Sequence, residues 1–191
     1  MVIDMQKGFL SPSSPLFVAG APATVPACIR ALELCRGRRI PIFFVTRSYR
    51  ADGADVERAR LKAWREGGKP LSPGCAPELS GAVPAEFGVA DYYVVKPRFS
   101  AFFATELDML LRRLGIDTLL LAGTATPNCI RATCYDALSL DYDVIVLADC
   151  TSSQTEDIQQ SNLRDMVNVG AVVISSSELP EALKEGDGEN D

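Results

Sequence analysis

The chain has 191 residues, of which 47% are apolar and 23% are charged, a composition typical of one globular domain with a full hydrophobic core. Its net charge is -6 and its basic residues are scattered, which argues against a surface that binds nucleic acid or an anionic membrane. It has neither an apolar run of the roughly 20 residues that a membrane helix needs nor the layout of a signal peptide. We therefore expect a cytoplasmic protein without a nucleic-acid or membrane partner.

In chain order, the apolar patterns alternate between strand-like and helix-like segments. They predict a strand over 1–3, a helix over 22–38, a strand over 40–46, a helix over 55–64, an irregular connection over 71–88, a strand over 92–95, a helix over 105–114, a strand over 118–122, a helix over 128–140, a strand over 144–147, a helix over 155–169 and a strand over 172–175. This alternation predicts a single-domain, doubly wound α/β fold with a mostly parallel sheet covered on both faces.

Histidine is absent from the chain. Its absence excludes Ser-His-Asp and Cys-His catalysis, and it excludes zinc sites that depend on imidazole. Without a C-x-x-C pair, the six cysteines are expected to be reduced thiols; they are Cys28, Cys35, Cys75, Cys129, Cys134 and Cys150. Proton transfer in any active site must then use Asp, Glu, Lys, Tyr or Cys.

Three residues that can carry chemistry stand just after predicted strands: Asp4, Lys96 and, across the short turn 123–128, Cys129. Parallel strands bring their carboxyl ends to one edge of the sheet, where ligands bind. Cys129 also opens a predicted helix, whose dipole and a nearby Lys96 ammonium would favour a thiolate. Asp4 could take the thiol proton, and backbone N–H groups of the turn could hold an oxyanion, which completes a site for acyl transfer.

Each of these residues has a plainer interpretation. A lone Cys129 is more often a buried structural thiol, Asp4 a turn residue and Lys96 a solvated charge. Cys134 lies about 140° around the helix from Cys129, so we expect it in the core. The Thr126–Cys129 spacing also resembles the peroxide-reducing loop of peroxiredoxins, although that fold does not explain Asp4 and Lys96. A binding module without catalysis is a further alternative.

Three blocks of sequence resemble the isochorismatase-like cysteine hydrolases: Val2-Ile3-Asp4-Met5-Gln6, Lys96-Pro97-Arg98-Phe99-Ser100-Ala101-Phe102 and Gly123-Thr124-Ala125-Thr126-Pro127-Asn128-Cys129-Ile130. The likeness covers residues 1–178, and residues 179–191 are expected to form an acidic, partly disordered tail. It implies a three-layer, Rossmann-like α/β/α fold and a catalytic triad of Asp4, Lys96 and Cys129. It also implies a cis peptide at Thr124–Ala125, with Ala125 and Cys129 as oxyanion donors.

The resemblance also indicates which reactions of the family this chain can catalyse. Nicotinamidases of this family hold a metal through Asp and His, and isochorismatases proper lack the cysteine. Without histidine we expect no metal and no organic cofactor, and nicotinamidase activity becomes the alternative. The remaining members hydrolyse ureido, carbamoyl and linear amides, such as ureidoacrylate or N-carbamoylsarcosine. They imply a hydrolase of carbon–nitrogen bonds that works through a thioester, often as a homo-oligomer. Their longer first strand implies that the chain is truncated at its start.

The candidate substrate-binding residues come from the blocks and the segments beside them. Arg98 can hold a substrate carboxylate through a bidentate pair, or it can form a surface ion pair. The aromatic candidates can line a pocket or simply pack in the core. The set comprises Gln6, Phe9, Trp64, Arg98 and Phe99, with Phe102 as a further aromatic. Residues 47–84 and 148–160 are the expected specificity loops, and they match no pattern that identifies the substrate.

Overall fold

The computed structural model describes residues 1–185. Six parallel strands form one sheet in the order β3-β2-β1-β4-β5-β6. They are β1 (Val2–Ile3), β2 (Phe43–Arg47), β3 (Tyr92–Lys96), β4 (Thr118–Thr124), β5 (Asp143–Ser152) and β6 (Val172–Ile174). The predicted doubly wound, parallel α/β fold is thereby confirmed.

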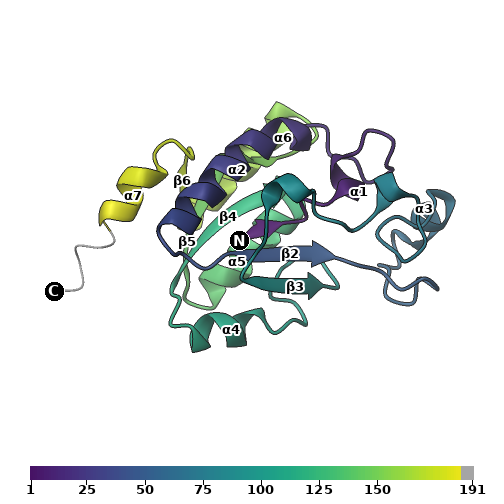
Figure 1. Cartoon of the computed structure of the whole chain (residues 1–191), viewed down its shortest axis with the longest axis horizontal. Helices are drawn as coiled ribbons and strands as arrows, with labels where there is room; N and C mark the ends of the chain where they lie inside the picture. The colour runs from purple at the N-terminus through teal and green to yellow at the C-terminus, as the bar shows by residue number, and fades with distance from the viewer. Residues whose placement is uncertain (186–191) are drawn as a thin grey trace.

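Helices cover both faces of this sheet (Figure 1). They are α1 (Lys7–Leu10), α2 (Ala21–Gly37), α3 (Leu61–Glu66), α4 (Leu107–Arg113), α5 (Arg131–Ser139), α6 (Glu156–Asn168) and α7 (Leu179–Glu185), with short turns at η1 (Pro77–Leu79), η2 (Ala85–Phe87) and η3 (Thr126–Ile130). The core cluster on one face includes residues of α4, α5 and α6, and the cluster on the other includes residues of α2 and α7. The protein therefore has three layers.

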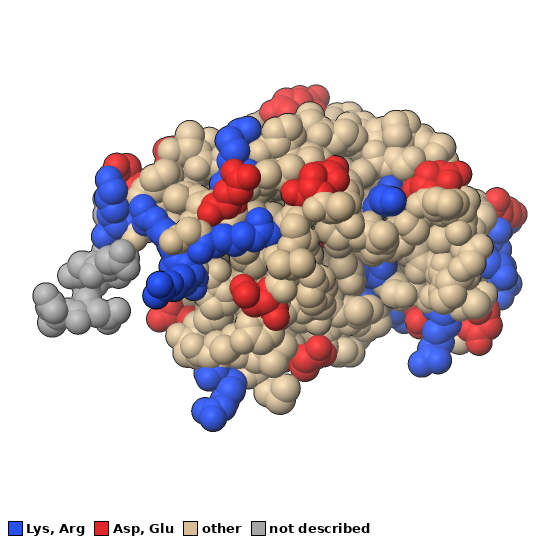
Figure 2. Space-filling model, in the orientation of Figure 1, with Lys and Arg blue, Asp and Glu red and all other residues tan. Residues whose placement is uncertain are grey.

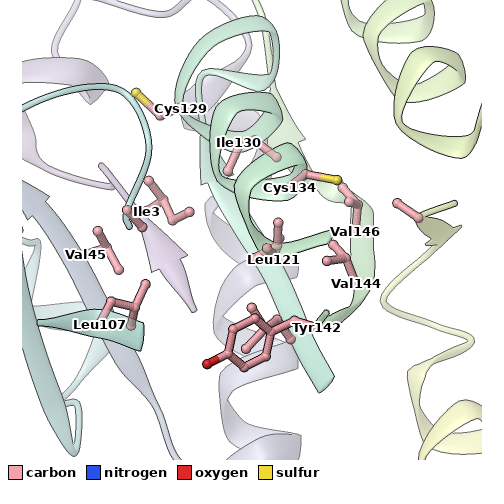
Figure 3. Packing of buried hydrophobic residues seen from close by; sticks show 14 of the residues in the cluster. Ile3, Val45, Leu107, Leu121, Cys129, Ile130, Cys134, Tyr142, Val144 and Val146 are labelled. Atoms are coloured by element: carbon pink, nitrogen blue, oxygen red, sulfur yellow. The ribbon is translucent and has the colours of Figure 1, made fainter. Parts of the chain in front are cut away.

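Continuous apolar strands are what such a sheet requires. In β2, Phe43 and Val45 belong to one core cluster, whereas Phe44 between them belongs to the other. Successive side chains of a strand point to opposite faces, so both faces of a central strand need apolar residues. Figure 3 shows the cluster on the α5 side, where Leu121 and Val146 from neighbouring strands lie beside the helix.

The chain order of the strands reverses between β1 and β4, which are direct neighbours in the sheet. The crevice outside such a reversal is where α/β sheets bind ligands. Gly123 allows the close contact there: its φ is +116°, and a Cβ at this position would lie 2.0 Å from the carbonyl oxygen of Ile3. Helices α1 and α3 gather at the end of the sheet to which β2 points (Figure 1).

Several segments differ from the sequence prediction, among them the following. The predicted helix 55–64 forms only from Leu61, because the preceding residues make loop contacts, such as the bond from Arg50 N–H to Asp55 Oδ1 at 2.8 Å. Strand β5 continues to Ser152, beyond the predicted 144–147. Residues 179–185 of the predicted tail form α7, whose Leu179 is fully buried against the α2 face; residues 186–191 lie outside the described part of the chain.

The surface agrees with the scattered charge of the sequence. On the face in view several Lys and Arg gather at the left with Asp and Glu beside them, and charges of both signs are scattered over the rest (Figure 2). Within residues 1–185, every helix is too short or too polar to cross a bilayer.

Candidate active site

Asp4, Lys96 and Cys129 meet at the carboxyl edge of the sheet, although they are far apart in sequence. Lys96 Nζ donates a hydrogen bond to Asp4 Oδ2 at 2.8 Å and lies 3.4 Å from Cys129 Sγ. Asp4 and Lys96 have no exposed surface, and Cys129 is 6% exposed. The three residues come from the ends of β1 and β3 and from the turn after β4. The structure therefore brings together the three residues that sequence reasoning had selected for catalysis.

The charge state of Cys129 differs from the sequence expectation. Burial, followed by the negative charge of Asp4, raises the pKa of the Cys129 thiol to about 11, against the lowering effect of Lys96 and Arg47. The lowering effect of Lys96 on this pKa agrees with the sequence expectation, but desolvation and the charge of Asp4 outweigh it, so a resting thiolate is not favoured. These effects favour the neutral thiol over the thiolate at pH 7. Among the described residues, the buried Asp4 Oδ1 has no hydrogen-bond partner, so an acceptor stands ready beside the thiol.

Arg47 is a functional residue that sequence reasoning missed. It ends β2, and its Nη2 lies 4.0 Å from Cys129 Sγ. Its Nη1 donates to Tyr49 Oη at 2.9 Å and forms an ion pair with Glu57, whose other oxygen accepts from Tyr49 at 2.7 Å. The strand-end rule that selected Asp4 and Lys96 also applies to the predicted strand 40–46, and it would have found Arg47.

Gln6 fixes the backbone of Arg47 rather than facing the substrate cavity. Its amide oxygen accepts from Arg47 N–H at 2.8 Å. Its amide nitrogen donates to the carbonyl oxygens of Arg47 and Gly81 at 2.9 and 2.7 Å. The side chain therefore ties the ends of β1 and β2 to the loop before η2.

A cavity of about 320 Å³ opens onto Cys129. It is mostly apolar and is lined by Phe9, Pro15, Leu16, Phe17, Val18, Arg47, Tyr49, Val56, Arg60, Ala63, Trp64, Pro70, Ala125, Pro127, Asn128, Cys129, Ser153 and Gln154. Phe9 and Trp64 of the predicted substrate-binding set thus line it, and Gln6, Arg98 and Phe99 do not. Arg98 instead donates to the carbonyl oxygens of Asp55 and Pro97 at 2.8 and 2.7 Å. This position does not support Arg98 as the anchor of a substrate carboxylate.

The turn between β4 and α5 carries Cys129 and is held from several sides. The Thr124–Ala125 peptide bond is cis. Thr126 Oγ1 donates to the carbonyl oxygen of Ser152 at 3.0 Å. Thr133 Oγ1 donates to the carbonyl oxygen of Cys129 at 2.7 Å and accepts from Ala101 N–H at 3.0 Å, which ties the turn to the loop after Lys96. These bonds therefore hold Cys129 in a fixed position.

Cys129 lies at the end of the core cluster, with its sulfur directed away from the packed side chains (Figure 3). Cys134 is fully buried among them, as its position on the helix predicted. Within residues 1–185, the Cys, Asp and Glu side chains form no group of three that could hold a metal ion.

Residues 1–178 match the isochorismatase domain. A protein of Arabidopsis thaliana described as a probable inactive nicotinamidase is 39% identical, over 96% of this chain and 94% of its own length. Maleamate amidohydrolase of Pseudomonas putida is 30% identical, over 96% of this chain and 85% of its own length. The crystal structure of an isochorismatase family protein from Desulfovibrio vulgaris is 42% identical and aligns with a TM-score of 0.88 over 96% of each chain. The resemblance carried by the three sequence blocks is confirmed, and the chain belongs to the isochorismatase family of hydrolases.

Proposed function

We propose that this protein is a cysteine hydrolase that cleaves the carbon–nitrogen bond of a small linear amide, ureido or carbamoyl compound through a thioester. The observation that carries the proposal is the buried contact of Asp4, Lys96 and Cys129, of which Cys129 lines a cavity. A nucleophile, a proton acceptor and a fixed cation are the groups that acyl transfer needs. A protein that only binds a ligand would not require all three in contact.

The neutral resting thiol defines the first step. Asp4 accepts the Cys129 proton as the sulfur attacks the substrate carbonyl, so that no free thiolate accumulates. The C–N bond of the tetrahedral intermediate then breaks, and Asp4 returns the proton to the leaving nitrogen, which departs as ammonia or an amine. Asp4 next takes a proton from water as the water attacks the thioester. The product leaves as a carboxylic acid, or as a carbamic acid from a ureido or carbamoyl substrate, and the proton on Asp4 returns to the thiolate of Cys129.

Lys96 has two tasks in this scheme. Its ion pair with Asp4 orients the carboxylate, and its position 3.4 Å from the sulfur stabilises the negative charge that develops on Cys129. Ala125 supports the oxyanion role assigned to it: it lines the cavity, and its backbone N–H donates no hydrogen bond to another described residue. Cys129 N–H is the second proposed donor.

The size of the cavity supports a small substrate, since about 320 Å³ stands at the lower end of the ~300–1,000 Å³ range of ligand sites. The relative named maleamate amidohydrolase acts on a linear amide. Nicotinamide remains the alternative substrate. The Arabidopsis relative is described as a probable inactive nicotinamidase, which argues against nicotinamide as the substrate of this chain and keeps a non-catalytic binding module as a second candidate.

The test is ammonia release from ureidoacrylate, maleamate, N-carbamoyl amino acids, biuret and nicotinamide. Cys129→Ala should abolish release from the true substrate, whereas Cys134→Ala, which removes a core thiol remote from the cavity, should retain it. Release that persists in Cys129→Ala would disprove the proposal. Silence across the panel, together with a Cys129 that resists alkylation even at high pH, would favour the binding module.

A further inference from the structure

Arg60 stands out among the residues that line the cavity. It lies at the start of α3 and is half-buried, and its guanidinium carbon lies 4.7 Å above the centre of the Phe99 ring. Within residues 1–185, the Arg60 side chain makes no hydrogen bond and no ion pair. A guanidinium has five N–H donors. Described residues therefore leave its donors unoccupied, and the opposite charge that it acts on is that of Glu57, whose pKa Arg47 and, less strongly, Arg60 lower against the effect of burial.

The other charged side chains at the site already form ion pairs with side chains of opposite charge. Lys96 is paired with Asp4, and Arg47 is paired with Glu57. Cys129 carries no charge at rest. These groups sum to zero, so Arg60 leaves the cavity with a net charge of about +1. Acidic residues are absent from the cavity lining.

The walls near Arg60 are apolar and aromatic. Val56, Ala63 and Trp64 are close to Arg60 in sequence and line the same cavity. Trp64 is held in place by a hydrogen bond that its Nε1 donates to the carbonyl oxygen of Pro70 at 2.8 Å. Such walls expel water, which strengthens an ion pair formed between them. An apolar cavity with one unmatched cation suits a ligand that has a short carbon body and one negative charge.

We propose that Arg60 binds a carboxylate of the substrate, so that the preferred substrates are amides that carry a free carboxylate elsewhere in the molecule. This inference rests on the proposed amide hydrolysis at Cys129 and adds the chemical class of its substrate. Arg60 holds the carboxylate through charge-assisted, bidentate hydrogen bonds and thereby presents the amide carbonyl to the thiol.

Neither of the other two arginines near the site fits this role as well. Arg47 is occupied by Tyr49 and Glu57, and a substrate carboxylate there would compete with an ion pair that is already buried. Arg98 donates to backbone carbonyls outside the cavity. Arg60 alone among the three combines a position in the cavity wall with the absence of a protein partner in the described chain.

The experiment compares each anionic amide with its neutral methyl ester. The probes are maleamate, ureidoacrylate and N-carbamoylglycine, each beside its ester, assayed for ammonia release with wild type, Arg60→Gln, Arg60→Lys and Arg58→Gln. Arg58 is an exposed neighbour that does not line the cavity, so its variant is the matched control. Thermal unfolding of each variant checks that it is folded.

For wild type we expect the free acid to exceed its ester in kcat/KM by at least about 10-fold. Arg60→Gln should raise KM for the acid by about 10- to 150-fold, the range for losing charge-assisted hydrogen bonds, with kcat nearly unchanged and the ester little affected. Arg60→Lys should recover part of this loss, and Arg58→Gln should behave as wild type. Esters that react as well as acids, or an unchanged KM in Arg60→Gln, would overturn the inference while leaving amide hydrolysis intact.

A second readout separates this inference from the proposed function. Maleate binding to Cys129→Ala, measured by calorimetry, does not depend on turnover. We expect maleate to bind to Cys129→Ala and not to the double variant that carries Cys129→Ala and Arg60→Gln. If no probe releases ammonia but maleate still binds through Arg60, the hydrolase proposal fails and the carboxylate site stands. Absence of maleate binding, or binding that is indifferent to Arg60, would overturn the site.

Discussion

Replacement of Lys96 by Met should destabilise the protein strongly, because it leaves the Asp4 carboxylate buried without its partner. Both side chains are 0% exposed and 2.8 Å apart, and Asp4 Oδ1 has no hydrogen-bond partner among the described residues. Breaking a buried ion pair by removing one partner costs about 3–5 kcal/mol. For a chain of this length, 1 kcal/mol shifts Tm by about 2–4 °C, so we expect Tm to fall by about 6–20 °C.

The assay is denaturant unfolding of wild type, Lys96→Met, Asp4→Leu and the double variant. The double variant should be more stable than the sum of the single losses predicts, with a coupling energy of at least about 2 kcal/mol, because it removes both charges together. Lys62→Met is the matched control, since Lys62 is 89% exposed and lies 3.9 Å from Glu66. Its unfolding free energy should change by less than about 0.5 kcal/mol. If Lys96→Met lowers the unfolding free energy by less than about 1 kcal/mol, the reasoning from a buried ion pair between Lys96 and Asp4 is refuted.

Four further predictions concern Cys129 and the turn that carries it. Labelling of Cys129 by iodoacetamide, followed by mass spectrometry, should accelerate as pH rises past 9, because burial raises its pKa to about 11; a plateau near pH 8 would contradict this. Asp4→Asn should speed labelling at pH 8, since the charge of Asp4 raises that pKa, yet abolish ammonia release; slower labelling would contradict this charge effect, and retained ammonia release would contradict the proton-acceptor role. The native thiol keeps its proton where the unfolded thiol loses it, so this group's contribution to stability should fall as pH rises from about 9 to about 11. Gly123→Ala should lower the unfolding free energy by at least about 3 kcal/mol, because its Cβ would lie 2.0 Å from the Ile3 carbonyl oxygen. Gly37→Ala is the control and should be neutral or stabilising, because a Cβ there would have nothing within 4 Å. Equal changes in unfolding free energy for the two variants would refute the close contact of β1 and β4.

The grouping of Asp4, Lys96 and Cys129 at one edge of the sheet was predictable because it depends on backbone topology. Apolar runs identified the strands, and the parallel arrangement then placed Asp4, Lys96 and Cys129 at one edge. The same rule applied to β2 indicates Arg47. These positions follow from where each strand ends, and strand ends are visible in the sequence as a change from apolar to polar residues.

The cavity walls were less predictable, because they depend on contacts between loops. Arg98 and Arg60 are both arginines close to the site, but Arg98 is held by the carbonyl oxygen of Asp55 in a loop remote in sequence. The pKa of Cys129 was also misjudged, since a local argument from the helix and Lys96 does not include the desolvation produced by the folded chain. The homo-oligomer implied by the resemblance stays a prediction.

The decisive measurement is the mass of the Cys129 peptide after a rapid acid quench of the enzyme during turnover of a hydrolysed amide. We predict an added mass equal to the acyl group on Cys129, which hydroxylamine removes and which is absent from Cys129→Ala. Sustained turnover with an unmodified Cys129 peptide at every quench time, together with undiminished activity of Cys129→Ala, would contradict covalent catalysis by this cysteine.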